Sequence, residues 1–179
     1  MTGPARYDTV AIALHWWVAL MVLCALAVGL YMHDLPLSPH KLKVFSWHKW
    51  IGVTIFLFAV VRVLWRATHS PPALPAATPP WQRIAAHSTH HLLYALILVI
   101  PLSGWLMSSA YGVQVVYLSV LPLPDLVAKD KALADQLKEL HEGLNIAMVL
   151  LLVAHVGAAL KHHFVDRDEV LRRMLPARS

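Results

Sequence analysis

The chain has 179 residues, of which 58% are hydrophobic and only 14% are charged, and its formal net charge is +5. A soluble domain of this length cannot bury so much apolar surface, so the composition indicates a membrane protein formed by one domain, residues 1–179. Its single cysteine excludes an internal disulfide, an iron–sulfur cluster and a covalently attached c-type haem, which needs a Cys-x-x-Cys-His motif.

Four apolar segments follow one another, at about residues 10–31, 45–65, 84–108 and 141–164. A helix rises 1.5 Å per residue, so each segment is about long enough to cross the bilayer, and we predict an all-α bundle of four transmembrane helices. The first segment resembles a signal sequence, but its length and the histidine within it favour a retained span. Several tryptophans near the segment ends are typical of an aromatic belt, namely Trp16, Trp47, Trp50, Trp65 and Trp105.

The connections between the spans indicate the topology. Five prolines predict a stiff, non-helical connection over residues 67–82, whereas leucines at helical spacing predict an amphipathic helix over residues 125–142 that leads into the fourth span. If the N-terminus is cytoplasmic, nine Lys and Arg residues, including every Arg, lie on the cytoplasmic side and six lysines lie on the other. This asymmetry predicts that both termini are cytoplasmic. Topology and lipid headgroups explain the positive charge, so we expect no nucleic-acid partner.

Four of the twelve histidines lie within or at the ends of the apolar segments, and their depths form two pairs. His15 pairs with His155 near the cytoplasmic face, and His48 pairs with His141 near the opposite face. At about 100° per residue, the 14 residues from His141 to His155 fall about 40° short of four full turns, so the two share a face about 21 Å apart. Two imidazoles fill both axial positions of a haem iron, which leaves an electron-transfer centre. The pattern predicts two b-type haems; hydrogen bonding between helices would explain each histidine alone but not the matched depths.

His162 leaves two interpretations open. It lies seven residues after His155, close to the same helical face, and could serve a quinone as hydrogen-bond partner and proton donor. It also adjoins Lys161 and His163, so it could equally belong to a cluster of side chains at the membrane interface.

Three further histidines begin the third span at helical spacing. His87, His90 and His91 could bind a metal, but contact with water and headgroups is the simpler interpretation. Gly52 and Gly143, close in sequence to the outer histidines, could let a macrocycle approach the backbone, although small residues also serve helix packing.

Short motifs occur in all four spans. They are Ala13-Leu14-His15-Trp16, His48 with Gly52, Val60-Val61-Arg62, His87-Ser-Thr-His90 with Tyr94, Leu137-Lys138-Glu139-Leu140-His141-Glu142, His155, His162-His163 and Leu171-Arg172-Arg173-Met174-Leu175-Pro176. Together they resemble the prokaryotic cytochrome b561 family over nearly the whole chain. The resemblance implies a four-helix protein of the bacterial inner membrane that binds two haem b groups, the inner one through His15 and His155 and the outer one through His48 and His141.

The resemblance also implies an activity. The family includes a superoxide oxidase that takes electrons from superoxide at the periplasmic face and delivers them to ubiquinone. Transferred to this chain, His162 would contact the quinone, and Lys49 and Lys138 would attract superoxide toward the outer haem, although both lysines also fit as ordinary interfacial anchors. We therefore expect a superoxide:ubiquinone oxidoreductase.

Two other classes of function stay open. The chain could be a haem-bearing membrane anchor that relays electrons between the quinone pool and a periplasmic electron-transfer protein, with residues 125–142 as a docking surface. It could also be a membrane ion or metal carrier that uses the histidine clusters. The carrier predicts no haem absorbance, so a spectrum separates it from the other two.

Overall fold

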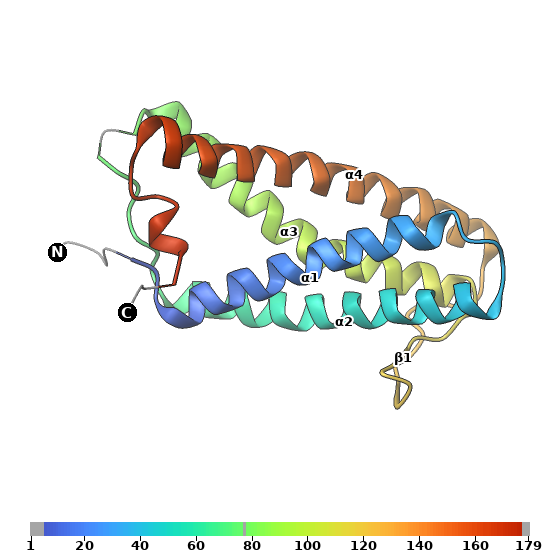
Figure 1. Cartoon of the computed structure of the whole chain (residues 1–179). Coiled ribbons are helices and arrows are strands. Elements are labelled where there is room, and N and C mark those ends of the chain that lie inside the picture. Colours follow the sequence, from blue (N-terminus) through green and yellow to red (C-terminus); the bar gives the residue numbers. More distant parts are fainter. Residues whose placement is uncertain (1–5, 77, 177–179) are drawn as a thin grey trace.

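The computed structural model describes residues 6–76 and 78–176, most of them in four long helices (Figure 1). These are α1 (Thr9–His33), α2 (Pro39–Thr68), α3 (Pro80–Ala110) and α4 (Lys131–Lys161). A short antiparallel hairpin follows α3, with strands β1 (Val116–Tyr117) and β2 (Leu121–Pro122). A π-helix (His162–Asp166) and a 3-10 helix (Arg172–Met174) follow α4. Four helices are long and apolar enough to cross a membrane, which confirms the predicted fold class.

Local capping residues determine where the helices begin. Asp8, Ser38 and Asp130 each accept a hydrogen bond from the backbone N–H three residues later, at the starts of α1, α2 and α4. α3 begins instead at Pro80, because proline has no N–H to lose in the first turn and its fixed φ suits a helix start.

The observed boundaries differ from the sequence expectations in three places. α2 begins at Pro39, six residues before the predicted span, because Ser38 caps an additional polar stretch. α2 also runs to Thr68 and α3 starts at Pro80, so the proline-rich connection is shorter than residues 67–82. Residues 125–142 do not form a helix of their own; helix begins at Lys131 and continues without a break through the fourth span.

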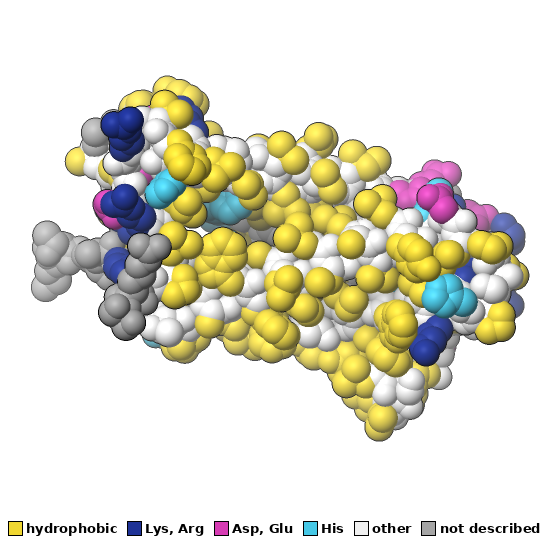
Figure 2. Space-filling view, in the orientation of Figure 1, with side chains coloured by type: hydrophobic (Ala, Val, Ile, Leu, Met, Phe, Trp, Pro, Cys, Tyr) yellow, Lys and Arg dark blue, Asp and Glu magenta, His cyan; other side chains and the backbone are white. Residues whose placement is uncertain are grey.

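The helices form a bundle in which α1 packs on α2, α2 on α3 and α3 on α4. Its small core lies at mid-height, around Val18, Ile55, Ala59 and Met148. Apolar side chains cover the middle of the surface and charged side chains gather at the two ends (Figure 2). This distribution suits a surface solvated by lipid in the middle and by water at the ends. We call the end where α1 begins and α4 stops the terminus end, and the opposite end the hairpin end.

Candidate functional site

At the hairpin end, α2 and α4 bring the rings of His48 and His141 close together. Their ring centroids lie 6.4 Å apart and the ring planes are nearly perpendicular, at 83°. The rings are thus too far apart for a hydrogen bond between them, and the separation leaves room for one metal ion bonded to a nitrogen of each at about 2 Å. This pair is one of the two that the depths of the histidines predict.

Ser103 of α3 orients the His141 ring. Its hydroxyl donates to the carbonyl of Ile100 at 2.8 Å, and its oxygen lies 2.9 Å from His141 Nδ1. Because the one hydroxyl hydrogen is already used, the oxygen accepts from Nδ1–H, and the neutral ring then carries its lone pair on Nε2. That tautomer is the one a metal needs, and such partners of ligating histidines typically tune metal affinity.

The His48 ring is packed tightly but lacks such a partner. Its Nδ1 is buried and makes no hydrogen bond of normal geometry within the described part of the chain, although the Ala25 carbonyl faces that side. Gly29 of α1 lies against this ring, and a Cβ there would come within 3.3 Å of His48 Cε1. Gly104 of α3 lies against the His141 ring in the same way, and a Cβ there would come within 3.1 Å of His141 Cε1. Both rings therefore lie close against neighbouring backbones, and a Cβ at either glycine would require the ring to shift by a few tenths of an ångström.

At the terminus end, α1 and α4 bring His15 and His155 together. Their ring centroids lie 6.2 Å apart with an interplanar angle of 66°, nearly the same spacing as in the other pair. Arg62 of α2 donates to His15 Nδ1 at 2.7 Å and lies over the ring of Tyr94 at 5.0 Å. A metal at Nε2 would require the proton on Nδ1, so Arg62 would then have to leave this nitrogen. Its guanidinium would remain a cation near this pair, suited to an anionic group such as a carboxylate.

His90 contacts this terminus-end pair. Its ring lies 5.3 Å from that of His155, in an edge contact, while the residue as a whole is exposed, as the water-facing interpretation expects. His87 and His91 are also exposed, and His91 Nδ1 bonds to the His87 carbonyl. The helical phase of α3 thus separates three histidines that look alike in sequence.

A tyrosine just before α1 adds a neutral donor near the terminus-end pair. Burial raises the pKa of the Tyr7 phenol above its ordinary value, an effect that the nearby Arg66 and Arg62 oppose. The phenol therefore keeps its proton at neutral pH and can donate a hydrogen bond.

A glycine with open space in front of it lies near each histidine pair. A Cβ added at Gly52, Gly143 or Gly157 would meet nothing within 4 Å among the described residues. Gly143 and Gly157 each follow a histidine of α4 by two residues, so the same arrangement occurs twice on this helix. Two neighbouring imidazoles and an adjacent glycine fit a haem at each pair, and at the hairpin-end pair the His141 tautomer is also oriented by Ser103.

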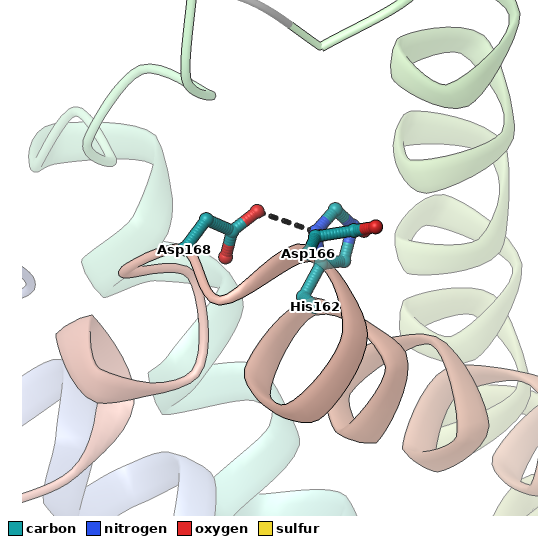
Figure 3. Close-up of side chains that lie close together, drawn as sticks. All are labelled: His162, Asp166 and Asp168. Carbon is teal, nitrogen blue, oxygen red and sulfur yellow. Dashed lines mark hydrogen bonds and ion pairs between the residues drawn. The ribbon is translucent and has the colours of Figure 1, made fainter.

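The other predicted residue of α4, His162, lies where the helix widens into the π-helix. Its Nδ1 lies 2.6 Å from a carboxylate oxygen of Asp168 and 3.3 Å from one of Asp166 (Figure 3). The donor atoms of these three residues lie within 4.8 Å of one another, but Lys161 already pairs with Asp166 at 2.6 Å. The cluster is therefore better described as a histidine held by carboxylates than as a metal site.

A cavity of about 300 Å³ adjoins this cluster. It is lined by His163, Phe164, Arg167, Asp168 and Arg172, and it shares Asp168 with His162. Arg167 has a left-handed backbone, with φ of 53°, which turns the chain back over the end of α4. Trp16 then donates to the Met174 carbonyl at 2.8 Å, so this returning segment is attached beside His15.

The two lysines expected to attract superoxide lie at the hairpin end. Lys49 is partly buried, and its Nζ lies 3.5 Å from the Val113 carbonyl. Lys138 is more exposed and forms an ion pair with Glu142 at 3.6 Å. Lys49 therefore keeps more of its charge uncompensated than Lys138 does.

Sequence reasoning did not single out several residues of these sites, namely Arg62 as a histidine partner, Ser103, Gly29 and Gly104. Arg62 carried a signal, because a charge within an apolar span indicates a function. The serine and the two glycines carried none, since their roles depend on which helix lies opposite.

The chain is similar in sequence to known proteins over nearly its whole length. The family model described as prokaryotic cytochrome b561 matches residues 6–177. "Cytochrome b561 homolog 2" of Escherichia coli (strain K12) is 38% identical over 175 residues, which cover 96% of this chain and 92% of the relative. "Cytochrome b561 homolog 1" of the same organism is 29% identical, covering 97% and 98%. "Probable superoxide oxidase CybB" of Yersinia pestis is 26% identical, covering 96% of each.

The family match and the relatives agree with a helical membrane bundle that carries paired histidines. The family name implies b-type haem and electron transfer within the membrane. The chain belongs to the prokaryotic cytochrome b561 family.

Proposed function

We propose that this chain binds two haem b groups and carries electrons from superoxide at the hairpin end to ubiquinone at the terminus end. The observation that carries the proposal is the pair of facing imidazoles at each end, at 6.2 and 6.4 Å, with α4 contributing one histidine to each pair. When bound, such haems supply one-electron carriage without an open coordination position. His15 and His155 would hold one haem, and His48 and His141 the other.

The electron balance needs two donors for each quinone. Two superoxide ions each lose one electron and become O₂, while one ubiquinone takes two electrons and two protons and becomes ubiquinol. Superoxide as donor is supported by the printed name of the Yersinia pestis relative and by Lys49 and Lys138 near the hairpin-end pair. An uncompensated cation there raises the local concentration of a small anion.

The quinone end is supported by the His162 cluster and its cavity. Asp168 holds the His162 ring through Nδ1, and it also lines the cavity of about 300 Å³, which is within the range of ligand pockets. We infer that the quinone head group enters this cavity. His162 is not itself a lining residue, but its partner Asp168 is. From this position beside the cavity His162 would donate a hydrogen bond to a quinone oxygen, and the carboxylates would return protons to it from water.

The orientation in the membrane is part of the proposal. The described arginines lie toward the terminus end, so the positive-inside rule favours a cytoplasmic terminus end and a periplasmic hairpin end. Superoxide would then be consumed outside and quinone protonated from inside. A reporter fused after residue 176 and assayed on each side of the membrane tests this directly.

The decisive experiment exposes purified, haem-loaded protein to a pulse of superoxide and follows haem reduction, then adds a ubiquinone analogue and follows reoxidation. We expect rapid reduction, and slower reduction in Lys49→Gln than in Lys43→Gln, which removes a more exposed lysine of the same helix. Absence of reduction by superoxide would reject the donor. If a periplasmic electron-transfer protein co-purifies in equal amount and reduces the haems instead, the relay-anchor function replaces the oxidase.

A second experiment tests the two haem pairs separately. His48→Ala and His155→Ala should each lose one haem by stoichiometry, with different bands missing from the reduced-minus-oxidised spectrum. His33→Ala removes an exposed histidine with 72% of its side chain accessible, and it should keep both haems. Loss of the same haem in both variants contradicts the pairing.

A further inference from the structure

The segment between α3 and α4 is unusually apolar for a connection. Gly112–Pro124 contains no charged residue, and its hairpin points large apolar side chains outward. Leu118 and Leu121 are both 55% exposed, and Val120 is 82% exposed. An aqueous loop is ordinarily polar, so these side chains lack the environment that such residues favour.

Two tryptophans set the level of this hairpin along the bundle. Trp50 of α2 donates its indole N–H to the Val116 carbonyl at 2.7 Å, and Trp105 of α3 donates to the Pro124 carbonyl at 3.1 Å. Tryptophan concentrates where the hydrocarbon layer meets the headgroups. The two legs of the hairpin are therefore attached at the level of the interface, rather than held out in water.

The hairpin leaves the bundle sideways. It projects from the flank of α2, across the direction of the helices, and its tip is covered by apolar side chains that continue the apolar surface of the bundle (Figures 1 and 2). Tyr117 keeps its base against α2 through a hydroxyl contact with Thr54 at 3.0 Å. Because the hairpin lies at the level of the interface and points outward from the bundle, it extends parallel to the plane of the membrane.

The turn at the tip places Leu118 in a backbone conformation that leucine disfavours. Val120 N–H donates to the Tyr117 carbonyl at 3.1 Å, and Leu118 and Ser119 between them have φ of 52° and 60°. Such a turn prefers Asn or Gly, because a leucine with positive φ crowds its own Cβ. In water, the exposed leucine side chain gains no contact that offsets the backbone strain. In an apolar medium, burial of the side chain stabilises it and offsets that strain.

We propose that the tip of this hairpin, Leu118–Leu121, inserts among the acyl chains of the leaflet at the hairpin end and anchors the bundle laterally. Phospholipid fits better than a protein partner because the tip offers no charge for recognition and is continuous with the lipid-facing surface. The turn bond and the strand pairing satisfy part of its backbone, so the insertion is shallow and leaves the remaining polar groups of the turn within reach of the headgroups.

Fluorophore accessibility tests the proposal on the haem-loaded protein in lipid nanodiscs. In a Cys24→Ala background, Val120→Cys is labelled with an environment-sensitive NBD group. Quenching is then measured with iodide in the buffer and, separately, with nitroxide-labelled phospholipid. Leu23→Cys, on the lipid-facing side of α1 and 60% exposed, is the lipid control. Lys131→Cys, with 83% of its side chain exposed, is the aqueous control.

We expect the label at residue 120 to behave as at residue 23, with iodide quenching several-fold weaker than at residue 131 and strong quenching by nitroxide lipid. Iodide quenching equal to that at residue 131 would place the tip in water and overturn the proposal. Quenching by neither agent would also overturn it, because a second copy or another protein would then cover the tip. A label at Ser119→Cys repeats the measurement should the first variant fold poorly.

Discussion

The Ser103 hydroxyl oxygen lies 2.9 Å from His141 Nδ1 while its hydrogen is donated to the Ile100 carbonyl, so one side chain of α3 determines the tautomer of a histidine on α4. This relationship is the clearest sign that the hairpin-end pair is prepared for a ligand. A neutral imidazole with Nδ1–H engaged presents Nε2 as the coordinating atom.

Ser103→Ala should therefore weaken haem binding at the hairpin-end pair. Loss of such a partner typically costs about 10–100-fold in metal affinity. The measurement is haem retained per protein after dilution and gel filtration, with the reduced-minus-oxidised spectrum showing which haem is lost. Ser46→Ala is the matched control, because that hydroxyl, within the described ranges, bonds only to the Leu42 carbonyl of its own helix. Equal retention in both variants would contradict the role of Ser103.

Arg62 should raise the midpoint potential of the terminus-end haem. A cation held in the bundle beside His15 disfavours the more positively charged oxidised state. Arg62→Met should thus shift one of the two potentials to lower values in a redox titration and leave the other in place. Arg62→Lys keeps the charge, so its midpoint potential should lie close to that of the parent chain. If the potential of Arg62→Lys is as low as that of Arg62→Met, the cause would be lost packing on Tyr94 instead.

His90 should be dispensable for haem retention despite its contact with His155. The paired geometry assigns both ligands of the terminus-end site to His15 and His155, so His90→Gln should keep two haems per chain. A small shift of the spectrum is compatible with its position in contact with the His155 ring. Loss of one haem in this variant, with retention in His15→Ala, would mean that His90 is the true partner of His155.

Asp168→Asn should slow quinone reduction without slowing reduction of the haems by the donor. In the proposed function the carboxylate orients His162 and returns protons to it, whereas the donor acts at the other end of the bundle. Stopped-flow traces separate the two phases. Glu169→Gln alters a neighbouring exposed carboxylate that pairs only with Arg172 among the described residues, and should leave both phases unchanged. Slowing of the first phase by Asp168→Asn would argue for a general structural defect.

Asp8 gives a pH-dependent prediction. Desolvation acts to raise its pKa, but hydrogen bonds from the Ala11 N–H and the Trp65 indole outweigh it and hold the pKa below its usual range. The stabilisation is therefore present above the unfolded pKa and is lost as pH falls through the folded pKa. Asp8→Ala should lower the free energy of unfolding by about 1 kcal/mol at neutral pH, the usual value of a helix cap.

Thermal unfolding in detergent at neutral pH and near pH 3 measures this effect. The difference between Asp8→Ala and the parent chain should shrink at the lower pH, where the parent carboxylate takes up a proton. Asp8→Asn keeps an oxygen acceptor for the cap and should show a smaller loss at neutral pH. A difference that stays constant across this range would mean that the charge plays no part.

Most of the architecture could be predicted from the sequence because hydrophobic length and helical phase are local properties. Four apolar segments predicted four spanning helices, and the separation of His141 from His155 predicted that one helix presents both toward the same side. Boundaries were less accurate, since a cap such as Ser38 extends a helix beyond its apolar part. The contact of His90 with His155 could not be predicted, because it depends on how α4 packs against α3, which the sequence of α3 does not reveal.

The sequence by itself determined that this is a four-span membrane protein with histidines at two depths, because the bilayer requires helices of a certain length and makes unpartnered imidazoles costly. Only the tertiary structure decided what surrounds each imidazole. Arg62 beside His15, Ser103 beside His141 and the sideways hairpin all depend on which helix faces which. The physical reason is that spacing along one chain defines a helical face, whereas the partner of that face is chosen by packing across the bundle.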